Sequence, residues 1–473
     1  MNRPRLSRAG RVAMGVAIAL AACHTTAAPR TTAGSDGGKR RAEPVVAAPP
    51  AATAPLPPAV AVAGPFSLGI NEALAVPMRF RKDMSGDRLG AMIEDDAGKV
   101  RTLGGTWVRG HTANFPRTSC ADLGAGGPGS AEMDLWVKTL GSDLHGLAML
   151  GPWPGNATAN RTENYVPADL PAYSACITAL VERYDGDGVD DMPGLVQPVK
   201  YWEFDNEPDL KNSQVARDAV RDYDPTTFCT PTEYAKVLLA TREAVRAADP
   251  TAKLLALGLY RPYAEQGQAY AKAVLAVPGA ADAFDVVSLH TYHDDDGERL
   301  AGAIRTFRTL VPGKPIWITE ASVTTATGED DQGRRVAAYV AQAAAAGAER
   351  LFWHTLADPP ERPSGRGGGG PGGGHAPGGH FATNSLLRGI EGGTEEKPAG
   401  AVYRHLAARL ATDDLFGATL DGEGAAKLRS GAVLLFAGSR LAAAGGTDLR
   451  TGDVIAAGAT ATAPAWLNAP PKP

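Results

Sequence analysis

The chain has 473 residues, of which 44% are hydrophobic, 21% charged and 6% aromatic. This balance is typical of a globular protein, and it excludes both a fully disordered chain and a polytopic membrane protein. The formal net charge is −5, so the sequence predicts no nucleic-acid partner.

Residues 1–22 have the features of a secretion signal. Four Arg residues precede an apolar run, Val12 to Ala22, which is far short of the roughly 20 residues that span a bilayer. The junction Leu20-Ala21-Ala22-Cys23 resembles the lipobox of bacterial lipoproteins. The resemblance implies that Cys23 carries lipid and, because His24 and not Asp follows it, that the protein is an outer membrane lipoprotein facing the periplasm or the cell surface. The alternative is an ordinary signal peptide and a secreted protein.

Residues 23–64 are predicted to form a disordered tether between the lipid and the first folded domain. The part after Cys23 has seven Pro residues, many Ala and Thr and no aromatic residue. It cannot bury enough apolar area to offset the entropy lost on ordering.

Three cysteines remain once Cys23 is assigned to lipid: Cys120, Cys176 and Cys229. An odd number in an oxidising compartment predicts one disulfide and one free thiol, without choosing the pair. The sequence has no C-x-x-C motif and no His-rich spacing of a metal site, so we expect no metal and no cofactor.

From residue 65 to residue 410, short apolar runs alternate with helical patterns, as in βα units around a parallel sheet. The eight predicted strands are Phe66–Asn71, Thr106–Arg109, Gly146–Leu150, Val199–Phe204, Leu254–Leu257, Val286–Leu289, Ile316–Thr319 and Leu351–Trp353. The predicted helices are Ala131–Leu140, Ala172–Arg183, Thr232–Ala248, Gly267–Ala276, Arg299–Leu310 and Gly333–Ala346. Eight such units predict an α/β fold, the (β/α)8 TIM barrel. The alternative, a doubly wound open sheet, lacks a Gly-rich phosphate loop after its first strand.

Residues 411–473 are predicted to form a small β-rich attachment to the barrel, because short runs such as Ala432–Ala437 alternate there with Gly. The tract Pro363–His380, with ten Gly and three Pro in 18 residues, follows the eighth strand. It predicts a mobile loop over the C-terminal face of the barrel.

Two carboxylates are predicted to face the mouth of this barrel. Strand four ends in the run Tyr201-Trp202-Glu203-Phe204-Asp205-Asn206-Glu207-Pro208, and strand seven ends at Glu320. Reactive groups of such barrels lie at the C-terminal ends of the strands. A carboxylic acid that protonates a departing oxygen and a carboxylate that attacks the anomeric carbon are the pair needed for glycosidic cleavage.

These strand ends resemble the retaining glycoside hydrolases of the large barrel clan, cellulase- and xylosidase-like enzymes that carry an acid/base Glu on strand four and a nucleophilic Glu on strand seven. The resemblance implies that Glu207 is the acid/base and Glu320 the nucleophile. It also implies that Asn206 binds the 2-hydroxyl of the sugar at the cleavage point and that Tyr292 orients Glu320.

Three further strand ends match the same family. Arg109 ends strand two, His290 follows strand six and Trp353 ends strand eight. The resemblance implies that all three lie around the sugar, with Trp353 as a platform for its ring, and that the substrate is a β-linked oligo- or polysaccharide. The third strand ends in Gly151-Pro152-Trp153 and lacks the polar residue that is common in the family.

Two other function classes fit the barrel less well. A surface barrel that binds glycan without cleaving it, or a structural lipoprotein, has no need of two carboxylates held together against their repulsion. A metal-dependent barrel hydrolase requires His and Asp clusters at strand ends, whereas strand one ends in Asn71 and Glu72.

Two acidic runs lie outside these strand ends. Asp185–Asp191 has oxygen ligands at calcium-loop spacing, but Val189 occupies the third ligand position, so an Asp-capped turn is expected and calcium is the alternative. The acidic cluster of Asp294–Asp296 and Glu298 follows strand six. It predicts a solvated loop with a helix cap, and a lining of the substrate groove is the alternative.

Overall fold

The computed structural model describes residues 66–71, 86–110, 128–151, 166–167, 169–211, 229–358, 383–390 and 392–470. The predicted signal peptide, Cys23 and the tether lie outside these residues, as do Cys120 and the Gly-rich tract 363–380. Within the described ranges, no helix combines the length and the apolar character needed to cross a bilayer.

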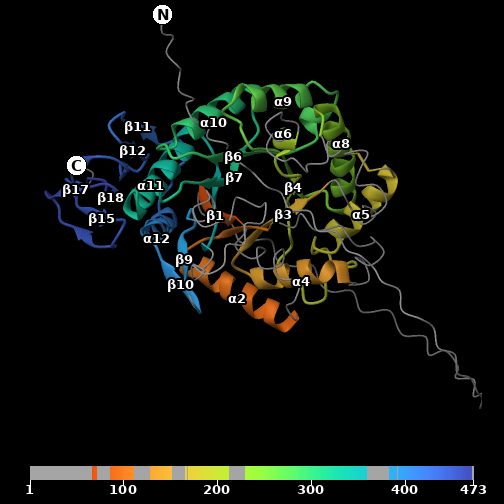
Figure 1. Cartoon of the computed structure of the whole chain (residues 1–473), viewed down its shortest axis with the longest axis horizontal. Helices are drawn as coiled ribbons and strands as arrows, with labels where there is room; N and C mark the ends of the chain where they lie inside the picture. The colour runs from red at the N-terminus through yellow and green to blue at the C-terminus, as the bar shows by residue number, and fades with distance from the viewer. Residues whose placement is uncertain are drawn as a thin grey trace, which may run out of the picture.

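Eight parallel strands close into a barrel at the centre of the molecule (Figure 1). In chain order they are β1 Ser67–Asn71, β2 Trp107–Gly110, β3 His145–Leu150, β4 Tyr201–Phe204, β5 Lys253–Leu259, β6 Val286–Tyr292, β7 Ile316–Ser322 and β8 Arg350–His354. Each strand pairs with the next along the chain, and β8 pairs with β1. The predicted (β/α)8 fold is confirmed, with every predicted strand present.

Helices surround the barrel and cover its outer face (Figure 1). They are α2 Gly86–Thr102, α4 Pro128–Leu140, α5 Leu170–Glu182, α8 Pro231–Ala248, α9 Glu265–Leu275, α10 Glu298–Leu310, α11 Glu329–Ala346 and α12 Pro398–Leu410, with the short α6 Pro208–Lys211 after β4 and a 3-10 turn at Ala280–Asp282. Helix α2 is not among the predicted elements, although Ile93, Ala97 and Val100 recur at the spacing of one helix face and are fully buried.

Local sequence signals explain where several helices begin. At the start of α8, the Thr230 hydroxyl accepts a hydrogen bond from the Glu233 amide at 3.2 Å, and the Glu233 carboxylate accepts one from the Thr230 amide at 3.0 Å. This reciprocal capping box satisfies two amides that have no partner within the helix. At the start of α5, the Asp169 carboxylate caps the Ala172 amide at 2.9 Å.

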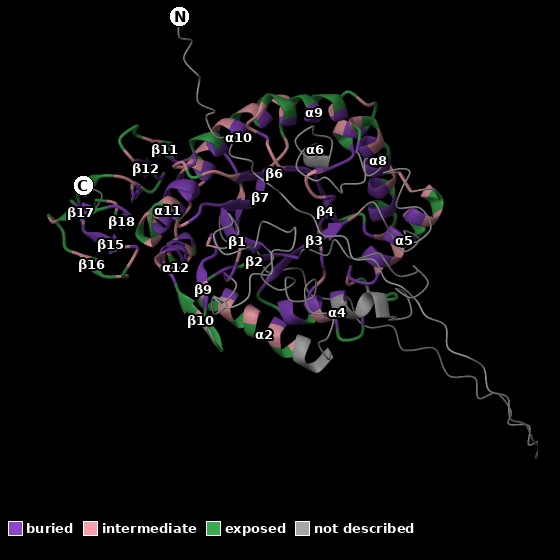
Figure 2. Cartoon of the chain, viewed as in Figure 1, coloured by how far each residue is buried: buried purple, intermediate pink, exposed green. Residues whose placement is uncertain are grey.

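The interior of the barrel changes from apolar to polar along the strands, and Figure 2 shows the strands buried at the centre of the molecule. Near the strand starts it is filled by a cluster of large side chains, Trp107, Leu147, Leu255, Val286, Trp317 and Phe352. Gly69 on β1 permits this packing, since a Cβ there would lie 2.5 Å from a Phe352 ring carbon. Side chains two positions apart share a face of a strand, so the next inward residues on β2, β4, β6 and β7 are Arg109, Glu203, Ser288 and Thr319.

After α12 the chain forms the small β attachment, which lies beside α11 and α12 (Figure 1). Its strands are β11 Thr419–Leu420, β12 Ala425–Lys427, β13 Val433–Leu435, β14 Ser439–Leu441, β15 Gly446–Asp448, β16 Val454–Ile455, β17 Thr460–Thr462 and β18 Ala465–Leu467. A hairpin of β9 Leu387–Ile390 and β10 Gly393–Glu396 precedes α12. The expected C-terminal β attachment is therefore present.

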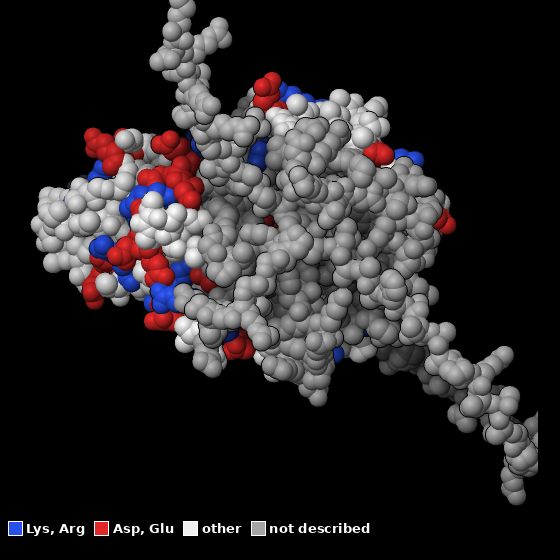
Figure 3. All heavy atoms as spheres, viewed as in Figure 1, with Lys and Arg blue, Asp and Glu red and all other residues white. Residues whose placement is uncertain are grey.

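The attachment shares its core with the barrel helices. Leu434, Phe436 and Trp466 belong to the same apolar cluster as the barrel core. Backbone bonds join the two parts, for example from the Gly417 amide to the Ala344 carbonyl at 2.9 Å. On the face seen in Figure 3, acidic and basic side chains are intermixed around this junction.

The two described cysteines differ in state. Cys176 on α5 is disulfide-bonded, and its partner lies outside the described residues. Cys229 is buried, keeps its thiol and contacts the Tyr270 hydroxyl at 3.2 Å. One disulfide and one thiol are what the cysteine count predicts.

Candidate active site

The ends of β4, β6 and β7 bring three titratable side chains together at the mouth of the barrel. Glu207 follows β4, His290 lies on β6 and Glu320 lies on β7. One side-chain atom of each lies within 4.8 Å of one atom of each of the others. The two carboxylates that the sequence marks as candidates are thus neighbours across the barrel.

The backbone at the end of β4 is strained where it presents Glu207. Asp205 and Glu207 have φ angles of 59° and 52°, in the left-handed region that residues with a Cβ rarely adopt. The Glu207 amide donates to the Gly258 carbonyl on β5 at 3.0 Å. Such outliers persist only where the surroundings impose them, and they are concentrated at functional sites.

Arg109 is the hub of the buried polar side chains below the mouth. Its Nε donates to Glu203, its Nη1 donates to Asn71 at 3.1 Å and to Glu320 at 2.5 Å, and its Nη2 donates to Asn206 at 3.0 Å. The side chain has no exposed surface. Burial would lower its pKa, but the charges of Glu203 and Glu320 outweigh burial and raise the pKa of Arg109 above its ordinary value.

A bulge in β7 lets two consecutive side chains reach the site. The register of β7 against β6 shifts between Leu289 and His290. Thr319 faces inward because it lies two residues after Trp317, and the bulge turns Glu320 inward as well, as bulges beside active sites often do. The Tyr292 hydroxyl then donates to Glu320 Oε2, and His290 Nδ1 lies 3.6 Å from the same oxygen.

The surroundings hold Glu320 in its charged form. Burial alone would raise its pKa, but the charges of His290 and Arg109, with those of His354 and the hydrogen bond from Tyr292, outweigh burial. The pKa of Glu320 therefore lies well below its ordinary value. Glu320 is suited to act as a nucleophile across the neutral pH range.

The surroundings of Glu207 have the opposite effect. Burial raises the pKa of Glu207, the negative charge of Glu320 adds to the rise, and the hydrogen bond with His290 Nδ1 at 3.2 Å opposes it in part. For His290 itself, burial lowers the pKa, but the charge of Glu320 and the bond to Glu207 outweigh it, so the pKa of His290 is raised. Two carboxyl groups with pKa values moved apart are the arrangement of an acid and a nucleophile.

Trp353 does not lie where the resemblance implies. Its side chain has no exposed surface, its indole N–H donates to the Asn384 carbonyl at 3.0 Å, and its ring meets Tyr339 of α11 edge-on with centroids 6.2 Å apart. Because Phe352 fills the barrel interior, its neighbour Trp353 points to the helix layer. The expectation that Trp353 is a sugar platform is wrong.

His354 is the inward residue at the end of β8. Its ring stands edge-on to Tyr292 with centroids 5.6 Å apart, and its Nδ1 lies 3.3 Å from the Asn384 side-chain nitrogen. Its charge contributes to the lowered pKa of Glu320. The alternation of side chains along β8 could have identified His354 from the sequence.

Glu203 is a third carboxylate of the site that the sequence alone does not assign. It is fully buried one step below the mouth, where Ser288 Oγ and Thr319 Oγ1 both donate to its Oε1, the latter at 2.9 Å. The period of two along β4 places it on the same face as Tyr201. Its contact with Arg109 depends on the closure of the barrel.

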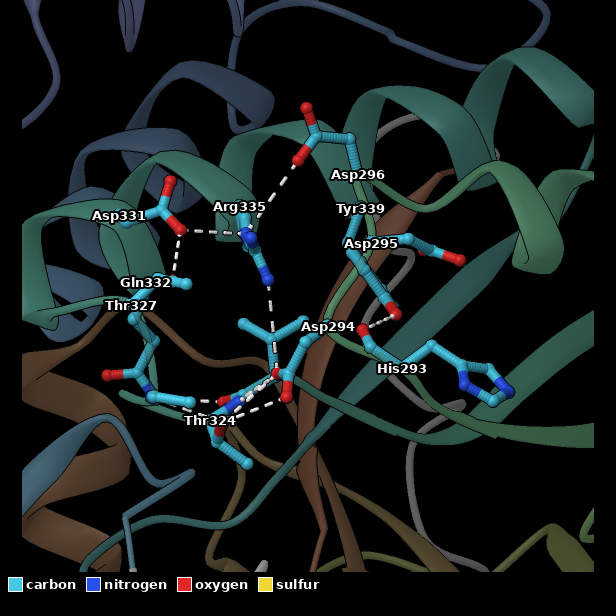
Figure 4. Close-up of polar contacts among 12 residues, drawn as sticks. His293, Asp294, Asp295, Asp296, Thr324, Thr327, Asp331, Gln332, Arg335 and Tyr339 are labelled. Atoms are coloured by element: carbon cyan, nitrogen blue, oxygen red, sulfur yellow. Dashed lines mark hydrogen bonds and ion pairs between the residues drawn. The ribbon is translucent and has the colours of Figure 1, made fainter. Parts of the chain in front are cut away.

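The rim beside β6 and β7 is held by a polar network (Figure 4). Asp294, after β6, accepts from the Thr324 amide at 2.8 Å and from its hydroxyl at 3.0 Å. Arg335 on α11 pairs with Asp331 at 2.9 Å and lies 3.8 Å from Asp296. Asp294–Asp296 is therefore not simply a solvated loop, because its side chains connect the segments after β6 and β7 to α11.

Among the described residues, two groups of three side chains have spacing that could hold a metal ion. The first is Glu207, His290 and Glu320. There the Arg109 guanidinium, 2.5 Å from Glu320, is a fixed positive charge that disfavours a cation.

The second group is Glu182, Asp185 and Asp187, at the turn that follows α5. The Asp187 amide donates to Asp185 Oδ1 at 3.1 Å, and the Asp191 carboxylate accepts from the amides of Gly186 and Gly188. These are the contacts of the expected Asp-capped turn, and calcium remains the alternative.

The part of the barrel that carries this site matches a known protein family. Residues 201–352 match the family model "Glycosyl hydrolase catalytic core". The match runs from the start of β4 into β8 and includes Glu203, Glu207, His290 and Glu320. No curated protein has a significant sequence match to the chain.

Solved structures with similar folds include a family 39 glycoside hydrolase from Bacteroides cellulosilyticus WH2, with 15% identity, a TM-score of 0.58 and coverage of 87% of this chain and 82% of that one. This likeness shows the fold alone. A GH39 β-xylosidase from Caulobacter crescentus has 18% identity, a TM-score of 0.47 and coverage of 76% and 73%. An α-L-arabinofuranosidase from Thermotoga maritima has 15% identity, a TM-score of 0.47 and coverage of 72% and 70%.

Proposed function

We propose that this chain, a glycosidase with a (β/α)8 catalytic domain, hydrolyses O-glycosidic bonds with retention of the anomeric configuration. The observation that supports the proposal is the carboxylate pair: oxygens of Glu207 and Glu320 lie within 4.8 Å of each other. Retaining glycosidases hold their two carboxyl groups about 5–5.5 Å apart, whereas inverting enzymes need about 6.5–9.5 Å to admit a water.

In the first step, Glu320 attacks the anomeric carbon and forms a glycosyl ester. The bond to the departing oxygen breaks, its electron pair stays on that oxygen, and Glu207 supplies the proton. The lowered pKa of Glu320 keeps the attacking oxygen unprotonated, and the raised pKa of Glu207 keeps the proton available.

In the second step, Glu207, now a carboxylate, takes a proton from water as the water oxygen attacks the anomeric carbon. The ester bond breaks, and its electron pair returns to Glu320. Two inversions give net retention. Arg109 and Tyr292, which donate to different oxygens of Glu320, hold its carboxylate plane during both steps.

A barrel that only binds glycan is the second candidate, but the opposite pKa shifts of two adjacent carboxyl groups disfavour it. The substrate proposed from the family resemblance is a β-linked oligo- or polysaccharide. A panel of aryl α- and β-glycosides and polysaccharides, with the first-formed anomer followed by NMR, tests both points. A product of inverted configuration would contradict the proposal, and the Glu320→Gln variant is the blank for contaminating activity.

We also propose that the mature chain is anchored through lipid on Cys23 and reaches the outer membrane. The support is the sequence Leu20-Ala21-Ala22-Cys23 and the Pro-rich segment that follows it. Cys23→Ser should abolish labelling by a fatty acid and release the protein from the membrane fraction, with kcat/KM unchanged. Unlabelled, soluble wild type would overturn the anchor and leave the enzyme assignment untouched.

A further inference from the structure

Arg109 donates hydrogen bonds to two carboxylates, and only one of them, Glu320, takes part in the proposed reaction. Glu320, which Arg109 contacts through Nη1, lies at the mouth. Glu203, which Arg109 contacts through Nε, has no exposed surface and lies deeper in the barrel. Glu203 is a buried charge for which the two-step reaction has no direct use.

The arrangement limits how Arg109 can bind the nucleophile. A guanidinium commonly holds one carboxylate with two parallel N–H bonds. Here Nε is directed to Glu203 and Nη2 to Asn206, so Glu320 receives a single N–H donor, from Nη1.

Glu203 is itself held in place from the other side. Ser288 and Thr319 both donate to its Oε1, and their hydroxyl oxygens lie 2.6 Å apart. Its Oε2 faces Arg109 Nε. The carboxylate is therefore anchored to β6 and β7 independently of Arg109, so it can fix the orientation of the guanidinium.

We propose that Glu203 is a positioning residue that divides the charge of Arg109, leaving the nucleophile with one N–H donor and only part of that positive charge. The inference rests on the retaining function proposed for Glu320. Under this proposal, Glu203 sets the ratio of the rate of ester formation to the rate of ester hydrolysis.

The two steps respond to the field at Glu320 in opposite directions. A stronger positive field stabilises the free carboxylate, which is the reactant of the first step and the leaving group of the second. Glycosylation therefore slows and hydrolysis of the glycosyl ester quickens when the field increases. A general loss of structure would slow both steps.

Glu203→Gln removes a negative charge while keeping the size of the side chain. The positive charge of Arg109 is then no longer partly neutralised by Glu203, so more of it acts on Glu320. We expect the ratio of the rate of ester formation to the rate of ester hydrolysis to fall about tenfold, the effect of one pKa unit on the basicity of Glu320.

The test uses the full chain and the 2-deoxy-2-fluoro analogue of an activated aryl glycoside that the wild type cleaves. Such a probe traps the ester on Glu320, so mass spectrometry gives the rate of trapping and recovery of activity gives the rate of release. In Glu203→Gln we expect slower trapping and faster release. Glu203→Asp keeps the charge and Ser288→Ala removes only one hydroxyl donor, so both controls should keep the wild-type ratio.

Asn71→Asp provides the opposite change and carries the test if Glu203→Gln does not fold. Asn71 Oδ1 lies 3.1 Å from Arg109 Nη1, so an added carboxylate there draws charge away from Glu320. We expect faster trapping and slower release. If wild type is trapped but neither variant moves the ratio, the role of Glu203 is wrong and the enzyme assignment stands; if wild type forms no ester, the retaining mechanism and the inference both fall.

Discussion

Arg109 and Arg350 are both largely buried in the barrel, at its two opposite ends. Arg109, on β2 near the mouth, is surrounded by carboxylate and amide oxygens. Arg350, the first residue of β8, has its guanidinium carbon 4.0 Å from the centroid of the Trp317 ring and 4.4 Å from that of Trp107. One end of the barrel surrounds an arginine with charge, and the other surrounds it with aromatic faces.

The two environments shift the pKa values of the two arginines in opposite directions. Burial lowers the pKa of Arg350, and the nearby Tyr201 and Glu349 compensate only in part. For Arg109 the two carboxylates outweigh burial and raise the pKa. At the base of the barrel, Arg350 thus completes the packing through cation–π contacts. At the mouth, Arg109 instead affects the charge of a reacting group.

The largest expected effect is at the mouth. Glu320→Gln should reduce kcat/KM by at least about 10⁴-fold, because the nucleophile is lost and binding alone remains. Its Tm should stay close to wild type, since the replacement keeps the volume of the side chain. Glu243→Gln, at an exposed position on α8, is the matched control and should be fully active. Substantial turnover by a purified Gln variant would exclude Glu320 as the nucleophile.

Glu207→Ala should have an effect that depends on the leaving group. We expect a loss of about 10²–10⁴-fold for substrates with basic leaving groups, because general acid catalysis contributes that much. An aryl glycoside with an acidic phenol should still form the ester, and azide should restore turnover with retained configuration. Equal losses on both substrate types, with no azide effect, would make Glu207 a structural residue.

The pH profile of kcat/KM is a second readout of the same pair. Glu207 must be protonated and its pKa is raised, so the alkaline limb should lie above the ordinary value of about 4.3 for Glu. Glu320 must be charged and its pKa is lowered, so the acid limb should lie below that value. Glu207→Ala, assayed with an acidic phenol, should lose the alkaline limb; a retained limb would assign it to another group.

At the base of the barrel, Arg350→Ala should act on stability and not on chemistry. Loss of the stacked guanidinium leaves a gap between Trp107 and Trp317, so we expect the free energy of unfolding to fall by roughly 2–4 kcal/mol. Chemical denaturation measures this change. The kcat/KM of the folded variant should equal that of wild type, and a large kinetic defect would break the contrast between the two ends.

The smallest expected effect is at Trp353. Trp353→Phe removes the indole donor to the Asn384 carbonyl and should cost about 1–2 kcal/mol of stability. Its KM should not change, because the ring faces α11 and not the mouth. His354→Ala, one residue further, should change kcat or KM, and the reverse pattern would restore Trp353 as the sugar platform.

Much of the barrel could be predicted from the sequence because the signal is local. Alternating apolar runs locate all eight strands, and turns and caps separate them from the helices. The ends of β6 and β7 could not be predicted as well, since both strands extend to Tyr292 and Ser322 past a bulge whose register depends on the neighbouring strand. A period of two cannot be followed across a bulge from one strand alone.

The sequence by itself determined which strand ends carry Glu207 and Glu320, because their positions follow from counting strands. The tertiary structure decided what these groups can do. Closure of the barrel sets Glu203 on β4 and Glu320 on β7 against the Arg109 guanidinium of β2. A pKa depends on burial and on charges a few ångströms away, and those neighbours come from strands far apart in the sequence.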